Sequence, residues 1–209
     1  MRNKVLPLSK PIVDAYPYHA NLQSVILNIP ESMPWILNNY VQLHTMKLFD
    51  NLRLDYYNYT LWKTCPWIYY QRIGRDIVLL KWDSIVNFLI EMIESGFYSF
   101  FMVDVSQIPS YDIKGEHDIF IFGFDLDRKV FYAADNFQFG KYQYKEISFE
   151  QIEKGYNRII ETGKKDYLSG IEIINLRQDN KYLIQKDYTF QVDFLVEQLV
   201  DYLNSKKHI

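Results

Sequence analysis

The middle of the chain alternates strongly apolar segments with very short connections, and this pattern restricts the fold more than any other feature. Strand-type runs cover residues 97–105, 117–125 and 130–135, and a further strand is expected at about 140–147. After residue 117 the connections are only a few residues long. Such connections join antiparallel neighbours, because a parallel crossover needs a much longer segment. This region therefore predicts an antiparallel sheet.

Helical patterns lie on both sides of this region, judged from apolar spacing, proline positions and capping residues. We expect helices over 19–29, from about Ser32, over 83–95, from Ser148 to about Glu161 and over about 188–205, with a last strand over 170–176. Residues 48–80 show no clean period, so we expect short strands or loops there. Helices that precede a meandering sheet are typical of an α+β fold and not of alternating α/β units.

The length fits one domain. A chain of 209 residues and 25.2 kDa has room for a single core of ordinary size. We predict one domain over residues 1–209, with a helical N-terminal part at about 12–95 and a sheet part at about 97–180. The C-terminal helix, at about 188–205, completes it.

Charge and cysteine content narrow the function classes. The net charge is −3, which argues against a nucleic-acid partner, and no apolar run approaches the length of a membrane span. The N-terminus lacks a signal-peptide pattern, so we expect a cytoplasmic protein without membrane association. Cys65 is the only cysteine, which excludes an internal disulfide and a cysteine-rich zinc site. We interpret it as a buried structural thiol and expect no metal and no cofactor.

Aromatic residues are abundant, at 17% of the chain. One interpretation is an aromatic core with tyrosine hydroxyls at its rim. The alternative is a groove lined by tyrosine and tryptophan, which would make the chain an interaction domain that binds a peptide. Composition alone leaves both open.

His117 and Asp135 are the strongest candidates for chemistry. His117 begins one strand and Asp135 ends the next, so a hairpin through the 126–129 turn brings both to the same end of the sheet. A carboxylate there can hold one imidazole nitrogen and leave the other free as a base. Asn136 could serve as a second orienting residue. The alternative is that His117 is a plain strand-edge residue and Asp135 a turn residue.

Three blocks of the sequence resemble one family. They are Tyr-Pro-Tyr-His-Ala-Asn-Leu-Gln-Ser-Val at residues 16–25, the Asp-x4-Pro loop at 104–109, and His-x4-Phe-Gly-Phe-Asp at 117–125 followed by Val-x4-Asp at 130–135. In this order they resemble papain-like cysteine enzymes, among them the bacteriocin-processing peptidases. The similarity is closer to the N-terminal domain of butirosin biosynthesis protein H, a family of acyltransferases in natural-product assembly. It covers roughly residues 12–140.

The resemblance implies a papain-like fold in which His117 and Asp135 are catalytic and Tyr18, His19 and Asn136 line the site. In the family a nucleophilic cysteine opens the first helix, where the helix dipole favours a thiolate. That position is Pro17 here, and proline has neither a nucleophile nor a backbone N–H. A shifted alignment would place Tyr18 or Ser24 there instead.

Three functions remain open. The first is a papain-like protein that has lost its nucleophile and acts as a binding or scaffolding protein in a biosynthetic pathway. The second is an active acyltransferase or hydrolase in which His117, as general base, promotes direct attack on a carrier thioester. The third is the peptide-binding interaction domain. The implied partners are an acyl or peptidyl carrier protein or a peptide-like small molecule.

Overall fold

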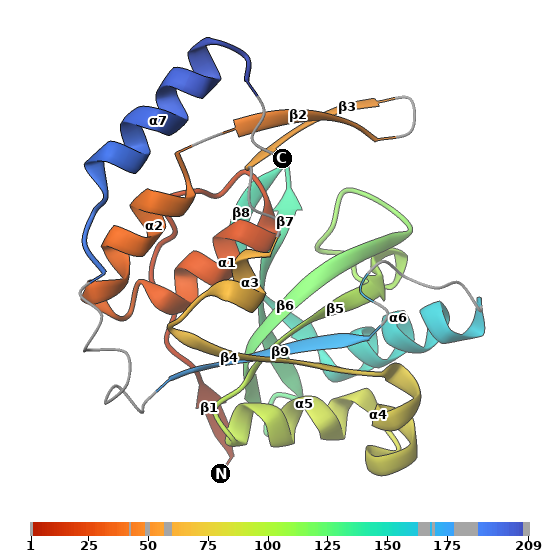
Figure 1. Ribbon diagram of the computed structural model, residues 1–209. Helices are drawn as coiled ribbons and strands as arrows, with labels where there is room; N and C mark the ends of the chain where they lie inside the picture. Colours follow the sequence, from red (N-terminus) through yellow and green to blue (C-terminus); the bar gives the residue numbers. More distant parts are fainter. Residues whose placement is uncertain are drawn as a thin grey trace. The chain divides into compact units, whose positions relative to one another are not determined.

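The computed structural model shows two compact groups of segments (Figure 1). It describes residues 2–41, 43–48, 51–56, 60–162, 168, 170–177 and 188–206. One unit comprises Met1–Asn28 and Ile68–Leu176, and the other comprises Ile29–Trp67 and Arg177–Ile209. The single domain predicted from length stays a prediction.

A seven-stranded sheet forms the centre of the first unit. Its strands are β1 (Asn3–Val5), β4 (Ile68–Ile73), β5 (Tyr98–Asp104), β6 (Glu116–Asp125), β7 (Val130–Gln138), β8 (Lys141–Ser148) and β9 (Ile171–Leu176). The strand order is β4-β9-β5-β6-β7-β8, and β1 pairs with the C-terminal end of β6. Every pair is antiparallel, so the predicted α+β class with an antiparallel sheet is confirmed.

The helices of this unit start and stop where local chemistry dictates. They are α1 (Pro17–Ile26), α4 (Arg75–Trp82), α5 (Ile85–Glu94) and α6 (Phe149–Glu161), with a 3₁₀ turn, η2, at Val105–Gln107. Ser84 caps α5 by accepting a hydrogen bond from the backbone N–H of Val86, and Gly96, with φ of 86°, follows its end. The capping box predicted at Ser148 and Gln151 is confirmed at the start of α6.

Helices cover opposite faces of the sheet (Figure 1). Phe100 and Phe120 are directly opposite in register and therefore share one face, and the ring of Tyr18 in α1 lies 6.0 Å from that of Phe100. Their neighbours in sequence point to the other face. There the Phe101 ring lies 5.9 Å from Tyr156 in α6. The sheet therefore has an α1 face and an α6 face.

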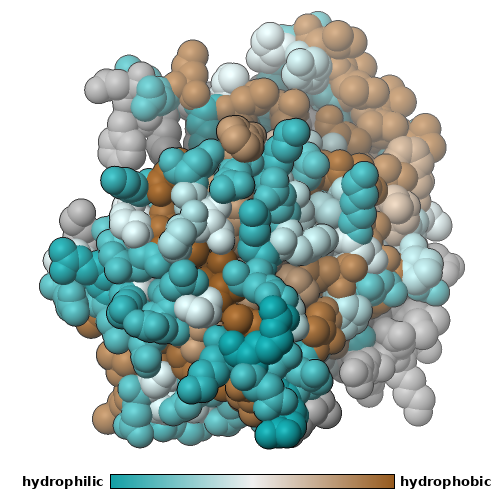
Figure 2. All heavy atoms as spheres, turned by 180° about the vertical axis from the view of Figure 1, so that it is seen from behind, coloured by the Kyte–Doolittle hydropathy of each residue, from teal (hydrophilic) through white to brown (hydrophobic). Residues whose placement is uncertain are grey.

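The second unit contains η1 (Pro30–Ser32), α2 (Met33–Asn39), β2 (Leu43–Leu48), β3 (Asn51–Tyr56), α3 (Leu61–Thr64) and α7 (Val192–Leu203). Strands β2 and β3 form an antiparallel hairpin. Helix α7 keeps several apolar side chains exposed, and Figure 2 shows hydrophobic atoms gathered over it. No helix in the described ranges is long and apolar enough to cross a membrane.

The interpretation of the first third of the chain was partly wrong. Residues 48–80 contain two helices, α3 and α4, in addition to strands, and the part expected to be helical, about 12–95, contributes β2, β3 and β4. The physical reason is tertiary: β4 is stabilised by pairing with β9, a strand about 100 residues later, which no local pattern reports.

Candidate functional site

The structure brings His117 and Asp135 together. The Nδ1 atom of His117 lies 3.1 Å from Oδ2 of Asp135, within the distance of 2.7–3.2 Å expected for a hydrogen bond. Asp135 is fully buried, whereas the His117 side chain is 25% exposed. The predicted approach of the two side chains is confirmed, and one edge of the imidazole remains accessible.

Oxygen atoms surround Nδ1 of His117. Besides Asp135, the backbone oxygen of Asp118 lies at 2.8 Å and its Oδ1 at 3.2 Å. Because all three are acceptors, Nδ1 carries a proton. Burial lowers the pKa of His117, but the hydrogen bond and charge of Asp135, with the charge of Asp118, outweigh it and raise the pKa from 6.5 to about 9.

Tyr111, a loop residue, contacts the carboxylate of Asp135. Tyr111, between η2 and β6, donates its hydroxyl hydrogen bond to Oδ2 of Asp135, the same oxygen that faces His117. The other oxygen, Oδ1, accepts the backbone N–H of Asn136 at 2.7 Å. The Tyr111 ring also lies 5.6 Å from the His117 ring and 4.8 Å from Phe137. Both carboxylate oxygens are therefore occupied, which fixes the orientation of Asp135.

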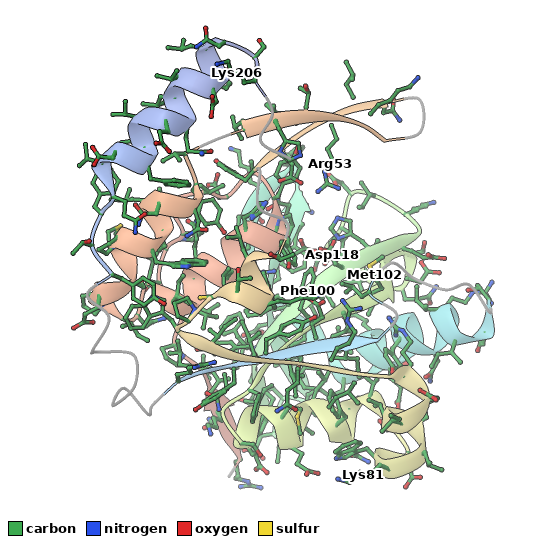
Figure 3. The ribbon with its side chains drawn as sticks, viewed as in Figure 1. Arg53, Lys81, Phe100, Met102, Asp118 and Lys206 are labelled. Carbon is green, nitrogen blue, oxygen red and sulfur yellow. The ribbon has the colours of Figure 1, made fainter. Side chains whose placement is uncertain are left out.

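Strand register assigns the pair to one face of the sheet. His117 lies opposite Val103, on the α6 face. Ala134 lies opposite Phe120, so its neighbour Asp135 also points to the α6 face. Met102 and Asp118 are partners on the α1 face, and Figure 3 shows them side by side.

Pro17 opens α1, where the resemblance places the nucleophile, but α1 packs on the face of the sheet opposite to His117 and Asp135, so the structure does not bring Pro17 to this pair. Asn136, on the α1 face, donates from Nδ2 to the backbone oxygen of Ala15 at 3.1 Å, which ties the start of α1 to β7. The side chain of Asn136 thus holds the helix start and does not orient His117; its backbone N–H holds Asp135 instead. The main contacts of α1 with the sheet are with β7, the neighbour of the His117 strand.

The other candidates on α1 are packed. His19 is 3% exposed, and its ring lies 5.6 Å from Tyr18 and 6.3 Å from Tyr16. Ser24 is fully buried and donates its hydroxyl to the backbone oxygen of Ala20 at 2.8 Å, which is a structural bond within the helix. In this structure Tyr18 packs beside Phe100, and His19 and Ser24 are buried within the helix packing.

Cys65 follows α3 in the second unit and is 3% exposed. Its prediction as a buried thiol is confirmed. Among the residues that the structure describes, no group of three or more histidine, cysteine, aspartate or glutamate side chains is arranged to hold a metal ion.

Sequence reasoning missed Tyr111 and Asp118. Asp118 was hidden because it adjoins His117, and consecutive strand residues are expected on opposite faces. Tyr111 lies in an irregular loop, where no periodicity indicates which side chain turns inward. The one available signal was the presence of a large aromatic residue in an otherwise polar loop, close to Pro109. Such a residue is more typical of a buried strand, so its position in a loop indicates that the side chain turns inward.

Stability should reveal the charge on His117. Its folded-state pKa lies above the unfolded value, so the stabilisation is complete below pH 6.5 and disappears as pH rises through about 9. We expect wild-type protein to lose on the order of 3 kcal/mol over this window relative to His117→Gln, since one pKa unit corresponds to about 1.4 kcal/mol. Urea unfolding of both proteins from pH 6 to pH 10 checks this. If the free energy of unfolding changed with pH in the same way for both proteins, the prediction would be wrong.

Comparison of the chain with known proteins finds no matching family model, no matching curated protein and no matching solved structure.

Proposed function

We propose that this chain is a papain-like binding or scaffolding protein, related to the carrier-thioester acyltransferases of natural-product biosynthesis, whose site lacks the cysteine nucleophile. The observation that carries the proposal is the pairing of His117 with buried Asp135 at 3.1 Å. Pro17, at the position that the resemblance gives to the nucleophile, has no reactive group, and α1 packs on the face of the sheet opposite to this pair.

The state of His117 favours binding over base catalysis. With a pKa of about 9 the imidazole is protonated at neutral pH, so it cannot accept a proton from an attacking group. It can instead donate a hydrogen bond from Nε2 to a ligand. A peptide-like small molecule, or the acyl group of a carrier protein, offers such an acceptor.

The alternative is an active acyltransferase or hydrolase with His117 as general base. Such an enzyme would need deprotonated His117. Its activity should therefore rise with pH toward about 9. Direct attack on a thioester requires no protein nucleophile, so the absence of cysteine at position 17 does not by itself exclude it.

The test mixes wild type, Cys65→Ser and His117→Gln with an acyl-pantetheine thioester. We expect no acyl adduct by mass spectrometry and no thiol release above background, because Pro17 cannot be acylated and Cys65 is buried. In parallel, ligand-observed NMR with the amide analogue should show binding to wild type that is weakened in His117→Gln.

Two outcomes would overturn the proposal. Thiol release that survives Cys65→Ser and is lost in His117→Gln would establish the active enzyme. Binding that is equal in wild type and His117→Gln would remove His117 from the site. Cys65 should react with iodoacetamide only after unfolding, which serves as an internal check that the protein is folded.

A further inference from the structure

Tyr111 meets Asp135 at the oxygen that also faces His117. The carboxylate Oδ2 accepts the Tyr111 hydroxyl and lies 3.1 Å from Nδ1 of His117. Two donors therefore share one acceptor atom. A hydrogen bond from Tyr111 draws charge away from this oxygen, so it weakens the attraction of Asp135 for the imidazole.

The loop that carries Tyr111 is fastened to the end of β7. The backbone N–H of Asp112 donates to the oxygen of Phe137 at 3.3 Å, and Oδ2 of Asp112 accepts the N–H of Phe139 at 2.9 Å. The loop's ends are closed where Val105 N–H donates to the oxygen of Gly115 at 2.8 Å. These bonds hold the phenol over Asp135 whether or not its own hydrogen bond forms.

Tyr111 remains a donor and does not give up its proton. Burial and the neighbouring charges of Asp135 and Asp118 raise the pKa of its phenol well above 10. Among the residues that the structure describes, the charged or titratable groups shown to contact or adjoin His117 are Asp118 and Glu116 on β6, Asp135 on β7 and Tyr111 in the loop. Of these, Tyr111 is the one neutral donor.

We propose that Tyr111 is a positioning residue whose hydroxyl, by sharing Oδ2 of Asp135 with His117, limits how strongly that carboxylate holds the imidazolium. Tyr111 thereby sets the pH range over which His117 is charged. The inference rests on the proposed function only in taking His117 as the group that meets the ligand; the effect on the imidazole itself exists without a ligand.

The experiment follows the four histidine rings by NMR titration in unliganded protein, with His117→Gln identifying the His117 signal. Tyr111→Phe removes the shared donor and keeps the ring, so the His117 pKa should rise by about half a unit or more. Tyr98→Phe is the matched control, because its buried hydroxyl donates to the oxygen of Pro7 at 2.7 Å and does not touch Asp135. It should leave the His117 pKa unchanged.

A second perturbation acts in the opposite direction. Placing 3-fluorotyrosine at position 111 makes the phenol a stronger donor with little change in shape, and the His117 pKa should fall. A His117 pKa that is unchanged, or that falls in Tyr111→Phe, would overturn the inference. Because no ligand is present, these results do not depend on whether the proposed function is correct.

Discussion

Asp135→Ala should destabilise the first unit by about 3–5 kcal/mol at pH 7, the usual cost of leaving a buried charge without its partner. The substitution removes the acceptor of Tyr111 and the counter-charge of His117 together. It also frees the backbone N–H of Asn136, which donates to Oδ1 at 2.7 Å. Denaturant unfolding followed by tryptophan fluorescence measures the loss.

The double variant Asp135→Ala/His117→Gln separates the causes. Removing the cation should restore part of the lost stability, because the imidazolium that has lost its buried partner is then gone. Asp118→Ala is the matched single control: it removes a carboxylate at 3.2 Å from Nδ1 that is 16% exposed, so the loss should be smaller. Equal losses in Asp118→Ala and Asp135→Ala would contradict the central role of Asp135.

Gly155→Ala should lower the free energy of unfolding by about 1–3 kcal/mol, the range for an overpacked core. Replacing glycine by alanine inside a helix usually has the opposite effect and raises the free energy of unfolding by up to about 1 kcal/mol. Gly155 differs because it packs closely against β5. A Cβ at this position would lie 2.9 Å from the backbone oxygen of Asp104 and 3.4 Å from Cβ of Val103. Helix α6 must therefore move away from β5, the neighbour of the His117 strand.

Asn157→Ala supplies the matched control, because Asn157 lies on the exposed side of the same helix. It should be neutral or slightly stabilising, since alanine has the higher helix propensity. A thermal or urea unfolding series of wild type and both variants gives the comparison. A stabilising Gly155→Ala would show that the contact between α6 and β5 is looser than described.

Local chemistry made part of the structure predictable. The capping box at Ser148, the stop at Gly96 and the strand runs after residue 97 depend on neighbours in sequence, and each was found. The approach of His117 and Asp135 was predictable for the same reason, since one short turn fixes the pairing of their strands.

Long-range pairing accounts for what was missed. Strand β4 depends on β9, and the inward turn of Tyr111 depends on an acceptor in another strand. The role expected for the Asn136 side chain failed similarly, because the partner that decided it, Ala15, lies 121 residues away. Interactions of this kind leave no periodicity in the sequence.

The order of the strands has a consequence for how the first unit assembles. Strand β9 is the last strand in the described part of the chain, yet it lies between β4 and β5 and bonds to both. Until residues 171–176 have left the ribosome, β4 has no partner and β5 has an open edge, which are the surfaces on which unfinished chains aggregate. Completion of the sheet is thus a late and non-local step, and contacts of such high sequence separation slow folding.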